Sequence, residues 1–431
     1  MKSPTLACAL AAALLTLPPT PARAFDATWS GFATLGYAIS NSRYTEQGSI
    51  VDRGTFRRDT LAAEQLDLRL SPQWSATLQA LAAPAQNNDD RWRLSAEWAF
   101  VAWRPDNDWL LRAGKTRLPL YLYSESLDIG VASDMARLPY EMYSISPTNE
   151  FTGLFVTRNF GQGERDFSVD LYDGAAHTDL RVWLRDGQAP QVAAGALYDS
   201  VKVEVRGLVV TARDPRLTWR LGIHSATTRR SDGQPLPVTY PWVALGPGIG
   251  YWQVSSELPG PGLQTVTRVR NLALTAGAEW NLGDGWRMAG EFVRMLQHDT
   301  QLGSDSRAGY LALFKRIDAW TPYLSVARQR SSDGLLAWRA QLIGATLPAG
   351  IPGGAPLVAA ERVAGESVYA ADQTSIALGA SYAVSPTAKL KAELLRTRVG
   401  AASAHFDPPP GYPDAKHLSV NTLSINFNIA Y

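Results

Sequence analysis

The residues of this chain that could carry out nucleophilic or acid–base chemistry are few and far apart in the sequence. A catalytic nucleophile needs a base, often a histidine, within hydrogen-bond reach. The five histidines belong to no recognisable serine–histidine motif and lie mostly in or beside predicted loops: His177, His224, His298, His405 and His417. The sequence therefore does not favour an enzyme, which is kept only as a minor alternative.

Two short motifs could in principle hold an ion or a cofactor. Asn87–Asp90 carries the oxygen ligands that a hard cation prefers, but a solvated loop tip is the better interpretation. Gly246–Gly250 is rich in glycine but lacks the Lys-Ser/Thr pair of a phosphate-binding loop. We therefore expect no metal site and no cofactor.

The composition excludes several classes of protein. The chain has 431 residues, with 41 Lys+Arg against 40 Asp+Glu, one cysteine, 14 Trp and 16 Tyr. A nearly neutral chain without a basic block lacks the surface that neutralises nucleic-acid phosphates. One cysteine excludes a disulfide framework, and so many aromatic residues argue against disorder. A nucleic-acid partner is therefore not expected.

Residues 1–24 are predicted to be a signal peptide. Lys2 precedes the apolar run Leu6–Leu17, and the segment ends in the small-residue cleavage pattern Ala22–Ala24. The run is shorter than the roughly 20 residues of a spanning helix. Residues 25–431 would then form the mature chain, and the removal of Cys8 with the leader would suit a bacterial envelope protein.

The mature chain alternates apolar and polar residues with a period of two. In 91–103, Trp92, Leu94 and Trp98 share one parity, whereas Arg93 and Glu97 share the other. This pattern is typical of a strand with one apolar face. No stretch approaches the roughly 18 apolar residues of a membrane helix.

About 16 such segments follow one another, and at roughly 9 to 14 residues they are longer than strands of soluble proteins. Short turns alternate with long loops between them. The fold class predicted is all-β: a transmembrane antiparallel up-and-down barrel of about 16 strands, with both termini on the short-turn side. The segments lie near 28–40, 60–70, 74–83, 91–103, 109–117, 151–160, 165–175, 199–213, 217–226, 268–280, 286–298, 307–316, 321–331, 373–384, 388–398 and 417–431.

Half of the tryptophans lie within about four residues of a short turn. In a membrane barrel they would form the aromatic girdle at one interface, whereas in a soluble protein they would pack in the core. The bias toward the turns favours the girdle. Its predicted members are Trp74, Trp103, Trp109, Trp219, Trp280, Trp286 and Trp320.

The C-terminal segment places apolar residues at every second position back from a terminal aromatic, with Phe427, Ile429 and Tyr431. This pattern resembles the assembly signal of Gram-negative outer-membrane barrels, although that family usually ends in Phe. The opening Ser30–Tyr37 is similar to the first strand of the 16-stranded porins. The resemblance covers the architecture of nearly the whole mature chain. It implies a cell outer-membrane protein in contact with lipid and the barrel-assembly machinery, and a possible homotrimer.

The resemblance also implies a long third loop that folds into the lumen and narrows it. Here 118–150 occupies that position and is rich in Tyr and in charges of both signs. Our hypothesis is that arginines of the early strands face carboxylates of this loop across the constriction. The candidate constriction residues are Arg69, Arg93, Arg112, Lys115, Arg117, Glu125, Asp128, Arg137 and Glu141.

A barrel of this size is too wide for side chains to fill. Strands about 4.8 Å apart and tilted by about 40° give a circumference of about 100 Å and a diameter of about 32 Å. Polar-parity residues would then line a water-filled channel, and the excess of basic residues among them leans weakly toward anions. The predicted wall residues are Asp67, Arg69, Arg93, Glu97, Arg112, Lys202, Glu204, Arg206, Arg220, Glu279, Arg287, Glu291, Arg307, Lys315, Lys389, Lys391 and Glu393.

The function implied is a porin, a passive diffusion channel for small hydrophilic solutes. Two alternatives stay open. One is a plugged structural or adhesin-type barrel whose long fifth and seventh loops form a binding surface, and the less favoured one is an outer-membrane enzyme.

Overall fold

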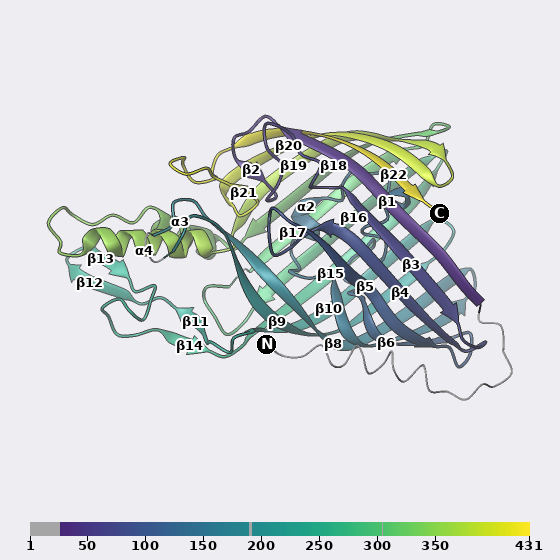
Figure 1. The fold of residues 1–431 in the computed structure, drawn as a ribbon, viewed down its shortest axis with the longest axis horizontal. Coiled ribbons are helices and arrows are strands. Elements are labelled where there is room, and N and C mark those ends of the chain that lie inside the picture. Colours follow the sequence, from purple (N-terminus) through teal and green to yellow (C-terminus); the bar gives the residue numbers. More distant parts are fainter. Residues whose placement is uncertain (1–25, 189–191, 304) are drawn as a thin grey trace.

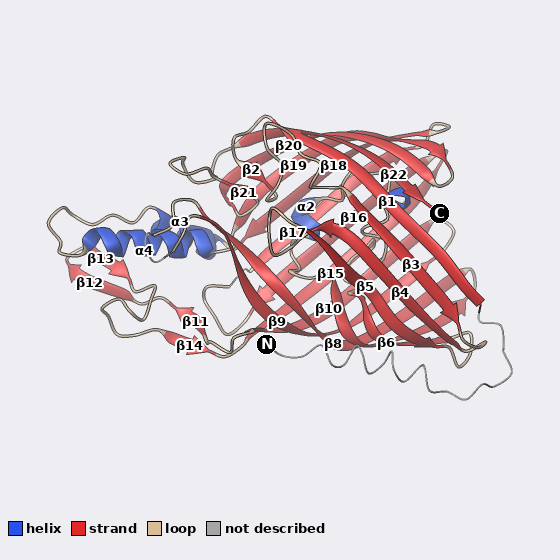
Figure 2. Cartoon of the chain, viewed as in Figure 1, coloured by secondary structure: helices blue, strands red, loops and turns tan. Residues whose placement is uncertain are grey.

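The computed structural model describes residues 26–188, 192–303 and 305–431, and these residues form one closed β-barrel with excursions at one end (Figures 1 and 2). The barrel has sixteen strands within this described part of the chain, the number that the alternation predicts. The predicted signal peptide, residues 1–24, lies outside the described residues. In the ranges described, no helix is long and apolar enough to cross a membrane.

Every neighbouring pair of barrel strands is antiparallel, and β1 closes the barrel on β22, with Phe32 opposite Ala430. All sixteen predicted segments correspond to barrel strands. The strands are β1 (Asp26–Ser40), β3 (Leu61–Arg69), β4 (Trp74–Pro84), β5 (Trp92–Trp103), β6 (Trp109–Arg117), β7 (Glu150–Gln162), β8 (Arg165–Leu184), β9 (Gly195–Arg213), β10 (Leu217–Arg230), β15 (Val269–Gly283), β16 (Trp286–Gln297), β17 (Ser306–Lys315), β18 (Trp320–Ser331), β19 (Ala371–Ser385), β20 (Ala388–Ser403) and β22 (Ser419–Ala430).

Alternation decides which side chains point out of the barrel. In β22, Leu423, Ile425 and Phe427 are exposed, whereas Ser424 and Asn426 between them are buried. An apolar outer face and a polar inner face are the arrangement that a bilayer requires of a spanning strand. The outside of the barrel therefore carries an apolar band.

The long connections at one end of the barrel carry additional structure. The connection after β10 contains β11 (Leu236–Thr239), β12 (Trp242–Gly246), β13 (Ile249–Trp252) and β14 (Gln264–Val266), and the one after β18 contains α3 (Asp333–Ile343) and α4 (Gly354–Ser367). These elements lie beyond the barrel end at the left of Figure 1. The Trp252 amide donates to Glu361 Oε1 at 2.8 Å, which joins the two connections.

Three further connections carry short elements. β2 (Thr45–Glu46) pairs with β21 (Phe406–Asp407), which joins the first long connection to the last. The connection between β6 and β7, residues 118–149, contains the 3-10 helix η1 (Gly130–Ala132) and the short helix α2 (Tyr140–Tyr143).

The predicted facing of β9 is wrong. Val201, Val203 and Val205 are buried and belong to an apolar cluster with side chains of 118–149, while Arg206 lies 3.6 Å from Asp173 with both side chains about three-quarters exposed. The valines are on the inner face because they pack on that connection. The outer apolar face of β9 comes from Leu208 and Val210 instead, nearer the short turn.

Five of the predicted wall residues are therefore on the outside of the barrel. Arg307 has the parity of the exposed Leu311, and Lys315 Nζ lies 4.9 Å from the ring centroid of the outward Trp286. A period of two defines two faces but does not identify the inner one. The residues that do not line the lumen are Lys202, Glu204, Arg206, Arg307 and Lys315.

Candidate functional site

Residues 118–149 lie against inward-facing side chains on the far wall of the barrel. Lys391 Nζ on β20 donates to the carbonyls of Gly130 and Met135 at 2.7 and 2.9 Å. Asn426 Nδ2 on β22 donates to the carbonyl of Ala136 at 2.7 Å. The Ala136 amide in turn donates to the Tyr323 hydroxyl on β18 at 2.9 Å. The backbone of this segment thus satisfies its hydrogen bonds on the wall.

A carboxylate on β16 holds a second part of the segment. Glu291 accepts hydrogen bonds from the hydroxyls of Tyr143 and Tyr310, at 2.5 and 2.9 Å, and from the Leu122 amide at 2.7 Å. Glu291 has the polar parity that predicted a wall residue, but it is buried under the segment rather than lining water. Nothing in the alternation distinguishes a covered wall residue from an exposed one.

Apolar side chains of the same segment complete its packing. Met142 is fully buried, and Tyr121 and Tyr143 meet edge to face with ring centroids 4.9 Å apart. They belong to a cluster that includes Phe151 and Phe155 of β7. The barrel therefore has an apolar core on its inside, which the predicted water-filled lumen did not include.

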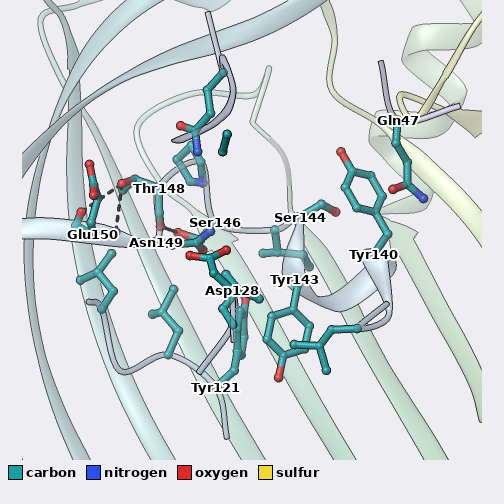
Figure 3. A pocket seen from close by; sticks show the side chains of 18 of the residues that line it. Gln47, Tyr121, Asp128, Tyr140, Tyr143, Ser144, Ser146, Thr148, Asn149 and Glu150 are labelled. Carbon is teal, nitrogen blue, oxygen red and sulfur yellow. Dashed lines mark hydrogen bonds between the residues drawn. The ribbon is translucent and has the colours of Figure 1, made fainter. Parts of the chain in front are cut away.

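A cavity of about 830 Å³ lies between this segment and the walls. Figure 3 shows Asp128, Tyr140, Thr148 and Glu150 around it, with Thr148 bonded to Glu150. Arg93 of β5 also lines the cavity and makes no ion pair among the described residues. The cavity has both apolar and charged walls and is large enough for a small hydrophilic solute.

Arg112 and Glu125 form a partly exposed charge pair between β6 and the segment. Arg112 Nη2 lies 3.8 Å from Glu125 Oε1, and the Glu125 side chain is 53% exposed against 11% for Arg112. The Arg112 guanidinium lies 4.1 Å from the ring centroid of Phe155. The arginine is thus held by an aromatic face, while the carboxylate meets solvent.

Arg117, at the end of β6, contacts Asp128 of the segment and Glu97 of β5, the latter at 3.4 Å. Arg112 and Arg117 are five residues apart, so regular alternation would point them to opposite faces. Gly114 lies between them with φ +133°, a conformation that side chains rarely adopt. Arg117 is the last residue of β6, and from the strand end its side chain reaches Asp128 of the segment.

The other candidate constriction residues have different surroundings. Lys115 Nζ pairs with Glu150 at 2.6 Å, and Glu141 accepts from Gln373 Nε2 at 2.8 Å in a buried position. Arg69 is the last residue of β3, beside the short turn, and makes no ion pair within the described ranges. The structure therefore brings Arg112, Arg117, Lys115 and the segment together, but not Arg69.

Arg137 and Asp59 form a buried bidentate ion pair between two long connections. The two hydrogen bonds measure 2.9 and 2.6 Å. Burial alone would raise the pKa of the Asp59 carboxyl, but Arg137 outweighs this effect and the pKa lies below its usual range. Arg137 is thus a structural anchor of the segment rather than an exposed pore charge.

A charge cluster that the sequence hypothesis missed lies between residues 118–149 and the barrel wall. Asp134 pairs with Arg287 of β16 at 2.7 Å and with Lys389 of β20 at 2.8 Å, and Arg287 pairs with Glu279 of β15 at 2.8 Å. Glu279, Arg287 and Lys389 have the inward parity that the sequence predicts. Their contact with Asp134, however, depends on the path of residues 118–149.

The other predicted features have the following positions. The seven girdle tryptophans lie near the short-turn end, and Trp74, Trp280 and Trp320 are among those that are clearly exposed. Asp89, from the candidate cation motif, is bonded instead by Arg181 at 2.7 Å. No group of three or more His, Cys, Asp or Glu residues that could hold a metal occurs in the part of the chain that is described.

Two of the histidines, His224 and His405, lie beside tyrosine, threonine and glutamine side chains. His224 lies 2.7 Å from the Tyr172 hydroxyl and 3.0 Å from Thr275 Oγ1. His405 lies 2.6 Å from Gln329 Oε1, and burial lowers its pKa to about 3. His405 therefore stays neutral at ordinary pH.

The fold is similar to that of solved outer-membrane proteins. OmpT of Vibrio cholerae, in its trimer form, matches with a TM-score of 0.53 at 11% identity, covering 95% of this chain and 100% of that chain. OprB of Pseudomonas putida matches with a TM-score of 0.50 at 10% identity, covering 94% of each. An anion-selective porin from Comamonas acidovorans has a TM-score of 0.48 at 11% identity, covering 95% and 100%.

At these identities the likeness establishes the fold alone, a porin-type barrel. No protein-family model and no curated protein matches the sequence.

Proposed function

We propose that this porin-type barrel is an outer-membrane channel through which small hydrophilic solutes diffuse. The observation that carries the proposal is the partly exposed Arg112–Glu125 pair between the barrel wall and residues 118–149, inside a closed barrel with an apolar outer band. Fixed charges at a narrow section select among permeating ions. Residues 118–149 would be the narrowing element.

The excess of basic over acidic residues that leaned toward anions becomes smaller, seven against five, once the outward residues are removed from the predicted wall. The predicted lean depended partly on Lys202, Arg206 and Arg307, which face outward. The charges at the narrowing are mixed, since Arg117 meets Asp128 and Lys115 meets Glu150. The selectivity of the channel would depend on the local balance at Arg112 and Glu125.

A plugged structural barrel is the second candidate, and one observation favours it. Residues 118–149 cover much of the far wall, so that Lys391 is 2% exposed and Asn428 is 1% exposed. In that case the long connections that contain α3, α4 and β11–β14 would form a binding surface. An enzyme has less support, because the buried His224 and His405 lie beside tyrosine, threonine and glutamine side chains and no carboxylate among the described residues orients either ring.

Membrane insertion by the barrel-assembly machinery, through Phe427, Ile429 and Tyr431, belongs to the same proposal. So does a homotrimer, for which the likeness to the trimer form of OmpT is the support.

The test is solute flux through the reconstituted barrel. Liposomes containing the protein should swell in isotonic solutions of small sugars, and the swelling rate should fall steeply as the sugar grows. Planar bilayers should show discrete conductance steps. The folding control is that the unheated protein stays folded in sodium dodecyl sulfate. A folded, inserted barrel that gives neither swelling nor conductance would be the plugged form.

A further inference from the structure

Arginines gather on the outward faces of four strands, β16, β17, β18 and β20, at the long-connection end of the barrel. Arg328 shares its face of β18 with the exposed Leu324 and Val326. Arg396 and Arg398 share theirs on β20 with the exposed Leu394. We call this set the arginine ladder: Arg294, Arg307, Arg328, Arg330, Arg396 and Arg398.

The strand register brings three members of the ladder directly opposite one another. Arg330 lies opposite Arg307, and Arg307 lies opposite Arg294. Like charges at directly opposite positions destabilise a sheet, and arginine cannot lose its proton to relieve the repulsion. Such an arrangement calls for an anion from outside the sheet.

The protein supplies only part of the required negative charge. Asp372 accepts from Arg328 and from Arg330, each at 3.2 Å, and Asp333 pairs with Arg330 at 2.5 Å. Arg396 and Arg398 have no ion pair or side-chain hydrogen bond to any described residue. Arg294 and Arg307 likewise have none, so four of the six arginines of the ladder carry positive charge that no described residue pairs.

A hollow of about 410 Å³ lies on the barrel surface beside Arg396 and Arg398. Its lining includes Arg328, Asp372, Thr374, Arg396 and Arg398. Arg328 and Arg398 stand opposite Thr374 on its two sides, and Arg328 Nη1 donates to the Thr374 hydroxyl at 2.7 Å. The hollow thus has guanidinium groups from two strands on either side of a central strand.

The height of the ladder on the barrel indicates where its anion comes from. Trp320 marks the short-turn end of β18, and Arg328 is eight residues further along the same strand. At about 3.4 Å per residue and a tilt of about 40°, this is about 21 Å, close to the height of about 25 Å of an outer apolar band. The ladder is therefore at the head-group level of the leaflet on the long-loop side, which in such barrels faces the cell exterior.

We propose that the arginine ladder binds the phosphate groups of a phosphorylated lipid in the outer leaflet, with Arg396 and Arg398 holding a phosphate in the hollow beside Arg328. The planar guanidinium donates two parallel hydrogen bonds to phosphate, and the exposed leucines next to it contact the acyl chains. The inference rests on the barrel spanning a bilayer and is independent of what passes through the lumen.

The test uses the full chain in detergent micelles and three probes. These are a phosphorylated outer-leaflet glycolipid, the same glycolipid with its phosphates removed, and inorganic phosphate. Binding is measured by titration calorimetry and by native mass spectrometry. The phosphorylated glycolipid should bind at least about tenfold more tightly than the dephosphorylated one, as expected when charged hydrogen bonds are lost.

The double variant Arg396→Gln/Arg398→Gln should lose at least about tenfold in affinity for the phosphorylated glycolipid. Arg396→Lys/Arg398→Lys keeps the positive charge but not the two parallel hydrogen bonds of the guanidinium, so it should lose less affinity than the glutamine variant. Arg206→Gln is the matched control, because Arg206 is equally outward on β9 but has its own partner Asp173. Its affinity should be unchanged.

Three results would overturn the proposal. They are equal binding of the two glycolipids, an equal loss in Arg206→Gln, and saturation by inorganic phosphate with no binding of the lipid. Each variant should still migrate differently on a gel before and after heating, which shows that its barrel is folded. The flux assay is run in parallel, so that a failure of lipid binding can be told from a failure of the channel.

Discussion

The Arg112 guanidinium lies 3.8 Å from the Glu125 carboxylate and 4.1 Å from the Phe155 ring centroid, so one side chain links the barrel wall, an inner aromatic and the connection 118–149. The aromatic face limits where the guanidinium can move, while Glu125 keeps contact with solvent. This is the position at which a change of charge should be felt by a permeating ion.

Reversing the charge of Arg112 should shift ion selectivity toward cations. In Arg112→Glu two carboxylates would face each other at the proposed narrowing, which would raise the local cation concentration and exclude anions. The reversal potential in a tenfold salt gradient should move in the cation-selective direction. Arg206→Glu, which changes an outward charge, should leave it where it was, and an unmoved potential in Arg112→Glu would remove Arg112 from the constriction.

Removing Asp59 should destabilise the barrel by about 3 kcal/mol, the lower part of the range for breaking a buried ion pair. Asp59→Asn leaves the Arg137 guanidinium buried without its bidentate partner. Removing both charges, in Asp59→Asn/Arg137→Gln, should be less costly than the sum of the single changes. Urea unfolding of the four proteins in micelles gives the coupling energy, and additive losses would contradict a functioning pair.

The same ion pair should make the free energy of unfolding fall as the pH becomes acidic. The Asp59 pKa is depressed in the folded barrel, so its contribution is present above the unfolded carboxyl pKa of about 3.9 and is lost as pH falls through the lower folded value. The difference in unfolding free energy between wild type and Asp59→Asn should therefore be constant above about pH 5 and shrink below about pH 4. A difference that persists unchanged at pH 2 would be inconsistent with this origin.

A side chain at Gly114 should disturb β6 and the arginines on either side of it. A Cβ there would clash with the Ala99 carbonyl oxygen, and the φ of +133° is unfavourable for any L side chain. Gly114→Ala should cost about 2 kcal/mol or more in unfolding free energy and broaden the distribution of single-channel conductance. Gly161→Ala is the control, since its Cβ would meet nothing nearer than 3.8 Å, and equal effects of the two changes would rule out strain at Gly114.

Truncating Glu291 should loosen residues 118–149. Glu291→Ala removes the acceptor for Tyr143, Tyr310 and the Leu122 amide. Unsatisfied buried donors cost about 1–3 kcal/mol each, so the segment should move away from this wall. Conductance should rise or become noisy, whereas a variant with wild-type conductance and noise would show that the segment does not narrow the path.

The strand layout could be predicted from the sequence because a bilayer requires long strands of period two, closed by short turns on one side. β22 shows this most clearly, since the exposed Leu423, Ile425 and Phe427 and the buried Ser424 between them follow the alternation read from the sequence. The number and order of the strands needed no tertiary information, because each strand pairs with its neighbour along the chain.

Which face of a strand is the inner one was decided by the tertiary structure. On β9 the valines turn inward because residues 118–149 present apolar side chains to them, and no local pattern along 199–213 contains that information. The pairing of Arg112 with Glu125 and of Arg137 with Asp59 depends in the same way on where distant connections run. The arginine ladder depends on strand register, since Arg294, Arg307 and Arg330 are separated in the sequence and become neighbours only when three strands align.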